Sequence, residues 1–470
     1  MRPSASVPVP ALAVAAALLL AGCLSASAPV APAAVPALDL AALPHPLVLE
    51  HDHAAPGLHG GLSSPNVQRL AQLDWDAALL GAYPAEWFGE MDVQGDLGFV
   101  AALMAGFAIV DLADPANPKT LSYTAVPPAY VADIKATKDG NTVLLGTQRS
   151  VGRLTGALGL PSVPVGVPNY TPVGAIGLQA WDATDKAAPV LAGYVYVDGG
   201  CHMVSVLAIG GDDYVYCAPN DNTVRVFRML RAGPAVVFEP VSIWSPGDLT
   251  SLAVYKVSPT QAQFTHDMTV QTDPLTGDPV MFVSFWDLGV HVVDVKDPAS
   301  PKLLGTWAGD EALLWDGKIH TTMATLIDGK RVVVTIPEYA SIPAVFVLDA
   351  TDYGAMRLLA EWQPRPDGDY GESPALFSTH NFQLVGSKLY LAMYHGGVWV
   401  LDLADPAKPT PVAWFLPDAE PDGMVAADAV PETWDVVVAN GHVFVSDIPT
   451  GLYAVHIEGD PLDAAYDSFA

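Results

Sequence analysis

Short segments of alternating apolar and polar residues recur along the chain, and pairs of them are joined by an Asp-Pro turn. The phrase is clearest in three copies, at residues 110–118, 293–301 and 401–409. Weaker copies lie at residues 181–189 and 348–352. Asp accepts hydrogen bonds from turn amides, and Pro prevents a strand from continuing. The pattern therefore predicts a repeated unit of strand, tight turn and strand.

A second hairpin precedes each copy, so that each unit holds four strands. Seven units begin near residues 89, 132, 202, 266, 320, 380 and 434, and a period of roughly 40 to 70 residues with four strands is typical of a β-propeller. The last unit holds only three strands, and residues 67–75 are expected to supply the missing outer strand and close the ring. We therefore predict an all-β, seven-bladed β-propeller over residues 61–470.

These repeats resemble the LVIVD-repeat family. The strand that enters the Asp-Pro turn carries the resemblance, in Ala108-Ile109-Val110-Asp111 and in His291-Val292-Val293-Asp294. It covers roughly residues 89–459. The resemblance implies a secreted or surface propeller and leaves the activity open, because a fold does not define an activity.

Charge excludes one class of partner. The chain has 470 residues, of which 51 are Asp or Glu and 21 are Lys or Arg, and its formal net charge is −30. Such a chain repels phosphate backbones and bare anionic lipid, so we expect no nucleic-acid partner. We also expect a monomer.

The N-terminus predicts export. Residues 1–22 combine Arg2, an apolar run and small residues, as a signal peptide does. Leu20-Ala21-Gly22-Cys23 resembles the lipobox of prokaryotic lipoproteins, which implies that Cys23 becomes the first mature residue and carries lipid. The alternative is an ordinary signal peptide. We expect a protein exported to the cell surface or periplasm, attached to the membrane by this lipid alone, since no other apolar run reaches 18 residues.

Residues 23–60, rich in Ala and Pro, are predicted to form a flexible tether between the lipid and the propeller. Exported proteins meet oxidising conditions, under which Cys201 and Cys217 could pair. The two residues fall on neighbouring strands but about three rows apart, so the sequence leaves the disulfide open.

One position of the repeat carries histidine in four consecutive units. Aligned on their first strands, units three to six place His202, His266, His320 and His380 in one column, although the chain has only 12 His. First strands line a propeller's channel, so these residues should converge at one end of its axis. Imidazole suits copper, iron and zinc. We predict a four-histidine transition-metal site, with copper or iron favoured over zinc. A ligand set with no obligatory carboxylate leaves the metal its full charge, which favours oxygen chemistry or Lewis acidity.

The next position is mostly polar, and we expect several of its residues to accept the second ring N–H of the histidines. These are Glu90, Asp133, Asp267, Thr321, Asn381 and Asp435. Hydrogen bonding to nearby backbone amides is an equally good interpretation of these side chains.

Loops on the same face supply the candidate catalytic residues, which are His395, Glu338 and Asp287. Residues 390–402, with His395-Gly396 between two strands, resemble a segment of the selenium-binding protein family. Those proteins are propellers and methanethiol oxidases with copper implicated in their activity. The resemblance covers about 20 residues, and because this chain lacks that family's cysteine motifs, the substrate does not carry over.

Two functions remain. In the first, the four histidines hold copper or iron, and the protein oxidises a small molecule with His395 as substrate ligand or base. In the second, the propeller binds a protein or glycan at the cell surface without catalysis. An open coordination position on the metal would distinguish the two.

Overall fold

A computed structural model describes residues 63–73, 88–103, 106–126, 130–148, 176–219, 221–247, 265–286, 288–309, 318–338, 343–364, 377–418 and 431–458. All belong to one compact unit, residues 35–470. The predicted signal peptide and tether, including Cys23, lie outside the described residues, and so does Asp287.

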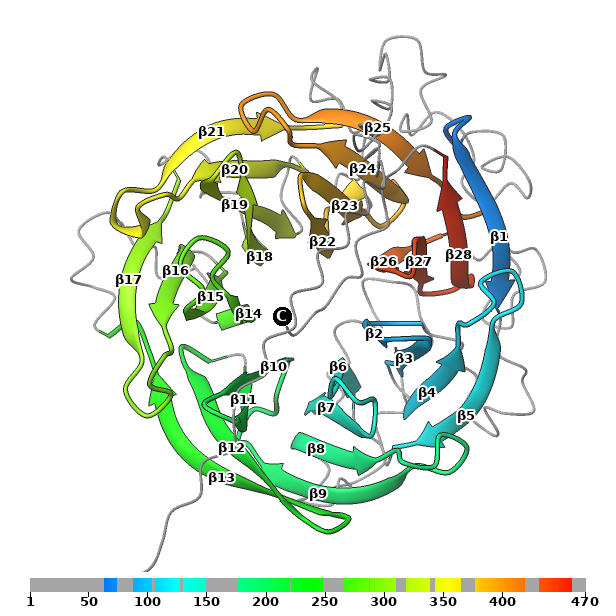
Figure 1. Ribbon diagram of the computed structural model, residues 1–470, viewed down its shortest axis with the longest axis vertical. Coiled ribbons are helices and arrows are strands. Elements are labelled where there is room, and N and C mark those ends of the chain that lie inside the picture. Colours follow the sequence, from blue (N-terminus) through cyan, green and yellow to red (C-terminus); the bar gives the residue numbers. More distant parts are fainter. Residues whose placement is uncertain are drawn as a thin grey trace, which may run out of the picture. The chain divides into compact units, whose positions relative to one another are not determined.

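Seven four-stranded antiparallel sheets surround a common centre as the blades of a propeller (Figure 1). Blade one contains β2 (Met91–Gln94), β3 (Leu97–Ala102), β4 (Gly106–Asp111) and β5 (Lys119–Ala125). Blade two contains β6 (Tyr130–Ala136), β7 (Thr142–Gln148), β8 (Gly177–Asp182) and β9 (Val190–Tyr196). Blade three contains β10 (Met203–Ile209), β11 (Asp212–Ala218), β12 (Val224–Ala232) and β13 (Ala235–Trp244).

The remaining blades follow the same order from the centre to the rim. Blade four contains β14 (Thr265–Thr272), β15 (Pro279–Phe285), β16 (Gly289–Asp294) and β17 (Lys302–Trp307). Blade five contains β18 (Lys318–Ile327), β19 (Lys330–Glu338), β20 (Val345–Asp349) and β21 (Arg357–Trp362), with a 3₁₀ turn, η5 (Tyr353–Ala355), before β21. Blade six contains β22 (Phe382–Val385), β23 (Lys388–Ala392), β24 (Val398–Asp402) and β25 (Thr410–Phe415).

Blade seven closes the ring with a strand from the other end of the domain. Its sheet order is β1-β28-β27-β26, where β26 is Thr433–Ala439, β27 is His442–Asp447, β28 is Gly451–Ile457 and β1 is Val67–Leu73. Strand β1 runs antiparallel to β28, with Val67 opposite Ile457 and Leu73 opposite Leu452. The seven-bladed fold and its closure by the N-terminal strand are therefore confirmed.

The Asp-Pro turns have the hydrogen bonds that their composition predicts. In blade one, Asp111 Oδ1 accepts from the Ala113 amide at 3.0 Å, and Asp114 Oδ1 accepts from the Ala116 amide at 3.1 Å. In blade six, the amide of Ala404 donates to Asp402 in the same way, at 2.8 Å. These bonds stabilise the turn at the end of the third strand, and the fourth strand, at the rim of the blade, follows this turn.

Side chains of the inner strands join neighbouring blades. Asp435 of blade seven accepts from the Met91 amide of blade one at 2.8 Å, and Asp133 of blade two accepts from the Val204 amide of blade three at 2.6 Å. Similar bonds to the next blade's amides come from Asp92, Ser205, Gln271 and Gln383. Because the inner strands of different blades share no sheet, these bonds satisfy buried amides that would otherwise have no partner.

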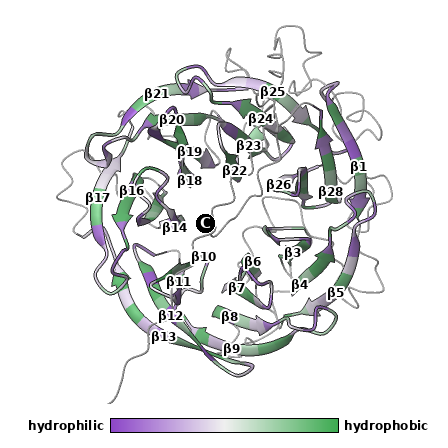
Figure 2. Cartoon of the chain, in the orientation of Figure 1, coloured by the Kyte–Doolittle hydropathy of each residue, from purple (hydrophilic) through white to green (hydrophobic). Residues whose placement is uncertain are grey.

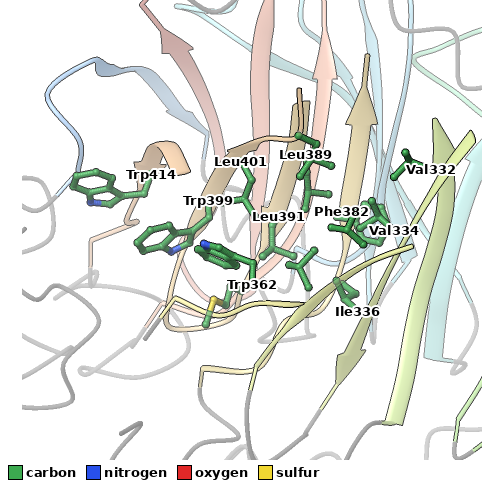
Figure 3. Packing of buried hydrophobic residues seen from close by; sticks show 14 of the residues in the cluster. Val332, Val334, Ile336, Trp362, Phe382, Leu389, Leu391, Trp399, Leu401 and Trp414 are labelled. Atoms are coloured by element: carbon green, nitrogen blue, oxygen red, sulfur yellow. The ribbon is translucent and has the colours of Figure 1, made fainter. Parts of the chain in front are cut away.

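Hydrophobic clusters lie between blades. The cluster between blades five and six contains Trp362, Trp399 and Trp414, and Trp399 has no exposed surface (Figure 3). The outer strands carry hydrophilic and hydrophobic residues side by side (Figure 2), and their side chains are more exposed than those of the inner strands. Each blade therefore buries both of its faces against its neighbours, which explains the apolar second and third strands of every repeat.

Cys201 and Cys217 form a disulfide with a Cα–Cα distance of 5.5 Å. The strand register pairs Cys217 with Val204, three positions beyond Cys201. The segment before β10 compensates for this offset of three residues, because Gly199 and Gly200 there have φ of 85° and 88°. This left-handed conformation, which glycine adopts readily, turns the segment so that Cys201 lies beside Cys217.

His291 predicts a pH dependence of stability. Its side chain is fully buried beside Trp244 and Phe285, and burial lowers its pKa to about 4. Below pH of about 6.5 the unfolded chain binds a proton that the folded chain does not, so stability falls as the pH falls towards 4. His291→Phe, which places there the residue that blade five has at Phe346, should remove up to about 3 kcal/mol of this loss. Urea unfolding of both proteins at pH 7 and 4.5 tests it, and equal pH dependence would contradict it.

Candidate metal centre

The histidine column lies at the start of the inner strands, and β-bulges position two of its members. Thr265 is opposite Phe285 whereas Asp267 is opposite Ser284, which leaves His266 as the extra residue. His320 is the extra residue of the same kind of irregularity in blade five. A bulge redirects its extra side chain without changing the strand beyond it. His266 therefore joins the other rings, while the next residue, Asp267, still lines the channel.

The structure brings the four predicted histidines together. Ring centroids are 4.6 Å apart for His202 and His266, 4.2 Å for His266 and His320, and 4.4 Å for His320 and His380. The Nε2 atoms of His202 and His266 are 3.2 Å apart. His266, His320 and His380 are buried. Four imidazoles from four consecutive blades thus form one continuous row.

Glu338 adds a carboxylate to this row. Its Oε2 lies 3.8 Å from His266 Nε2 and 3.7 Å from His320 Nε2, and its Oε1 lies 4.0 Å from His380 Nε2. His266, His320 and Glu338 have ligand atoms close enough together to hold one metal ion. The sequence predicted Glu338 as a catalytic residue and a ligand set without carboxylate. The structure instead makes Glu338 a candidate ligand, because antiparallel pairing of β19 with β18 puts the end of one strand beside the start of the other.

Hydrogen bonds at Nδ1 orient three of the rings. His380 Nδ1 donates to the Trp434 carbonyl at 2.8 Å, and His202 Nδ1 donates to Gln148 Oε1 at 3.0 Å. His320 Nδ1 lies 2.8 Å from Thr321 Oγ1. Since a carbonyl oxygen only accepts, the Nδ1 atoms of His380 and His202 carry the proton and their Nε2 atoms keep a lone pair. This is the tautomer in which Nε2 binds a metal.

Burial keeps these imidazoles neutral. It lowers the pKa of His202 to about 4 and that of His380 to about 3. Burial also lowers the pKa of His266 and His320 well below the usual value, and the neighbouring imidazoles lower it further. A neutral imidazole is the form that binds metals, so the site presents nitrogen lone pairs at neutral pH.

Aromatic side chains surround the row. The Trp286 ring stacks on His266 with centroids 4.6 Å apart, and the Trp434 ring lies 3.8 Å from that of His380. The Tyr394 ring lies 5.3 Å from that of His380. These rings exclude water and strengthen electrostatic interactions with any bound cation.

Of the six residues that we expected to support the histidines, Thr321 lies against His320 Nδ1, and the other five have other partners. Asp133 and Asp435 accept from backbone amides, as in the alternative interpretation. Asp267 lines the channel, and burial raises its pKa to about 7. Asn381 and Glu90 act indirectly: Thr321 donates to Asn381 Oδ1 at 3.2 Å, and Asn381 Nδ2 donates to Glu90 at 2.7 Å. They extend the hydrogen-bonded chain that begins at His320.

Sequence reasoning missed two groups that contact ring nitrogens, and it missed the contact of Tyr394 with Glu338. The two groups are the side chain of Gln148 and the backbone carbonyl of Trp434. Thr321, which follows His320 directly in the repeat, lies against a ring nitrogen as predicted. Gln148 ends a second strand and Tyr394 lies in a turn. No feature of the sequence indicates which side chain either residue contacts.

His395 directly follows Tyr394 in the chain but contacts other side chains than the histidine row does. Its Nε2 is 3.9 Å from Glu432 Oε1, and its ring centroid is 6.0 Å from that of Phe377. Burial raises the pKa of Glu432 to about 7, and that of the nearby Asp447 also to about 7. His395 and Glu432 thus form a buried acid–base pair, and the catalytic role of His395 stays a prediction.

A cavity of about 120 Å³ lies in the channel below the histidine row. Its lining combines methionines with buried acidic residues, and one cation, Lys135, lies among them. Lys135 Nζ is 2.6 Å from Asp133 Oδ1, and the surrounding carboxylates raise the pKa of the lysine. The cavity therefore disfavours anions.

Fold and site together define a seven-bladed β-propeller with a histidine-rich candidate metal centre on its axis. Residues 89–124 and 281–308 match the LVIVD repeat, so the predicted repeats are confirmed at blades one and four. No curated protein matches the chain. Among the described residues, no helix has the length and apolar character needed to cross a membrane.

Solved structures resemble the chain only at low similarity. A provisionally named 6-phosphogluconolactonase from Bacteroides fragilis has 13% identity and a TM-score of 0.47, over 81% of this chain and 95% of that one. A second from Bacteroides uniformis has 13% identity and a TM-score of 0.48, over 73% and 84%. The computationally designed Ika8 protein has 10% identity and a TM-score of 0.47, over 83% and 100%. At these values the resemblances carry no argument about activity.

Proposed function

We propose that the protein is an iron- or copper-dependent oxidase of a small molecule, exported and attached to the membrane through lipidated Cys23. The observation that supports the enzyme is the convergence of four neutral imidazoles with Glu338. The sequence of residues 1–23 supports the export and the anchor.

The donor set fits a redox-active metal. His266, His320 and Glu338 supply two imidazoles and one carboxylate, a combination that non-haem iron enzymes use with coordination positions left open for oxygen and substrate. His202 and His380 extend the nitrogen set and suit copper as well. Bound there, the metal would transfer electrons from a reduced substrate to dioxygen.

The protein's own groups define the rest of the reaction. A substrate that loses two electrons and two protons to dioxygen yields hydrogen peroxide, so the site must accept protons. His395 and Glu432 offer a buried acid–base pair at the same end of the propeller. Trp286 and Trp434 keep bulk water from the imidazoles, which protects a reduced metal.

Metal content and oxygen uptake test the proposal together. Purified protein, stripped with chelator, is reloaded with Fe(II) without oxygen or with Cu(II), and bound metal is measured by elemental analysis. We expect about one equivalent of one of these metals and oxygen uptake with a reduced small molecule such as a thiol, alcohol, amine or phenol. Less than about a tenth of an equivalent of either metal would refute the enzyme.

A non-catalytic surface propeller is the second candidate function. Outer strands β9 and β13 expose large apolar side chains, including Tyr194 (57%), Val237 (53%) and Ile243 (65%). Exposed apolar side chains that lie together are typical of protein-binding surfaces. Metal-free protein in the experiment above would favour this function.

A further inference from the structure

We propose that Tyr394 is a positioning residue that holds Glu338 with one carboxylate oxygen directed at the metal. The proposal rests on the metal site proposed above and specifies how its carboxylate binds. The phenol would donate a hydrogen bond to Oε1 of Glu338, and Oε2 would bind the metal beside His266 and His320.

The two oxygens of Glu338 have different surroundings. Tyr394 Oη donates to Oε1 at 2.5 Å, and this oxygen lies 4.0 Å from His380 Nε2. Oε2 faces His266 and His320 at 3.8 and 3.7 Å. Distances of 2.5–2.7 Å are typical of a hydroxyl that donates to an ionised carboxylate. With Oε1 held in this way, Glu338 would bind a metal between the imidazoles through Oε2 alone.

The backbone of Tyr394 indicates that this contact has a function. Three non-glycine residues of the described chain have positive φ. Two of them, Asp328 and Asn440, precede glycine in hairpin turns, where such residues are favoured. Tyr394, with φ of 30°, is a bulky residue for which this conformation is unfavourable. Strained residues of this kind concentrate at functional sites.

Neighbouring blades hold Tyr394 in this conformation. Its carbonyl accepts from the Gly397 amide at 3.2 Å and from the Thr433 amide of blade seven at 3.0 Å. Its ring packs between His380 and Trp434, and it is 3% exposed. A phenol fixed from two blades and excluded from water restricts the carboxylate more strongly than an exposed one would.

Tyr394→Phe removes the hydroxyl and keeps the ring. Removal of a partner that orients a metal ligand costs roughly 10- to 100-fold in metal affinity, and we expect a loss in this range. We also expect a changed Cu(II) electron paramagnetic resonance spectrum, because Oε1 loses the hydrogen bond from the phenol. Tyr453→Phe is the matched control: Tyr453 is fully buried and its hydroxyl bonds Thr450 at 2.8 Å, without contact to Glu338. Its affinity and spectrum should not change.

A double-mutant cycle shows whether Tyr394 acts through Glu338. Glu338→Gln should weaken metal binding by itself, and adding Tyr394→Phe should then have little further effect. Additive losses would overturn the inference, and so would unchanged affinity and spectrum in Tyr394→Phe. If the unmodified protein binds neither metal, the proposed function fails and the inference fails with it. If it binds metal but Tyr394→Phe has no effect, only the inference fails.

Discussion

His320→Ala is expected to lower the affinity for Fe(II) or Cu(II) by at least about 100-fold, since even changes behind a ligand cost 10- to 100-fold. His320 lies in the middle of the row, with His266 and His380 at 4.2 and 4.4 Å between ring centroids. Its Nε2 also lies 3.7 Å from Glu338. His320 thus has an imidazole on each side, a carboxylate contact and a hydrogen-bonded Nδ1.

Competition with a coloured chelator measures this affinity. His442→Ala is the control, because His442 lies at the opposite end of the β26–β27 hairpin from Trp434, and its Nδ1 bonds the Asn440 carbonyl at 2.8 Å. That variant should bind metal as the unmodified protein does. An unchanged affinity in His320→Ala would show that the row is a packing feature of the repeat and would remove the main support for the enzyme.

The sequence predicts the fold because each repeat carries its own local signals. Asp111 and Asp402 end a strand through bonds to amides two residues away, which a sequence pattern can show. The same equivalence of repeats predicts the histidine row, since symmetry brings equivalent residues of successive blades to one axis. Four residues could therefore be placed together without knowledge of any distance.

Residues outside the repeat pattern could not be placed in this way. The sequence places Glu338 on the same face as the histidines, but the bulge at His320, which sets the contact between the two, is not visible in it. Asp133 and Asp435 belong to the repeat pattern, but blade spacing decides their role, because it brings an unpaired amide within reach of each carboxylate. A repeat predicts which residues are equivalent, and only the three-dimensional structure shows what each one contacts.

Trp399→Ala is expected to lower the free energy of unfolding by about 3–5 kcal/mol, as large-to-small changes of buried aromatic residues do. Trp399 has no exposed surface and lies between Trp362 and Trp414, with ring centroids 5.7 and 5.8 Å away (Figure 3). Neighbouring blades can close the resulting cavity only in part, because both belong to a closed ring. Leu358→Ala, at a side chain 40% exposed on β21, should cost less than about 1 kcal/mol.

Trp399→Phe separates packing from hydrogen bonding at the same position. Blade five has Phe346 there, so a phenyl ring fits the repeat, but Phe cannot donate as Trp399 Nε1 does to the Gly396 carbonyl at 3.0 Å. Gly396 belongs to the turn that holds Tyr394. We therefore expect Trp399→Phe to lose less stability than Trp399→Ala and still to weaken metal binding. Urea unfolding and chelator competition measure the two effects, and a variant with normal metal affinity would show that the turn keeps its conformation without this bond.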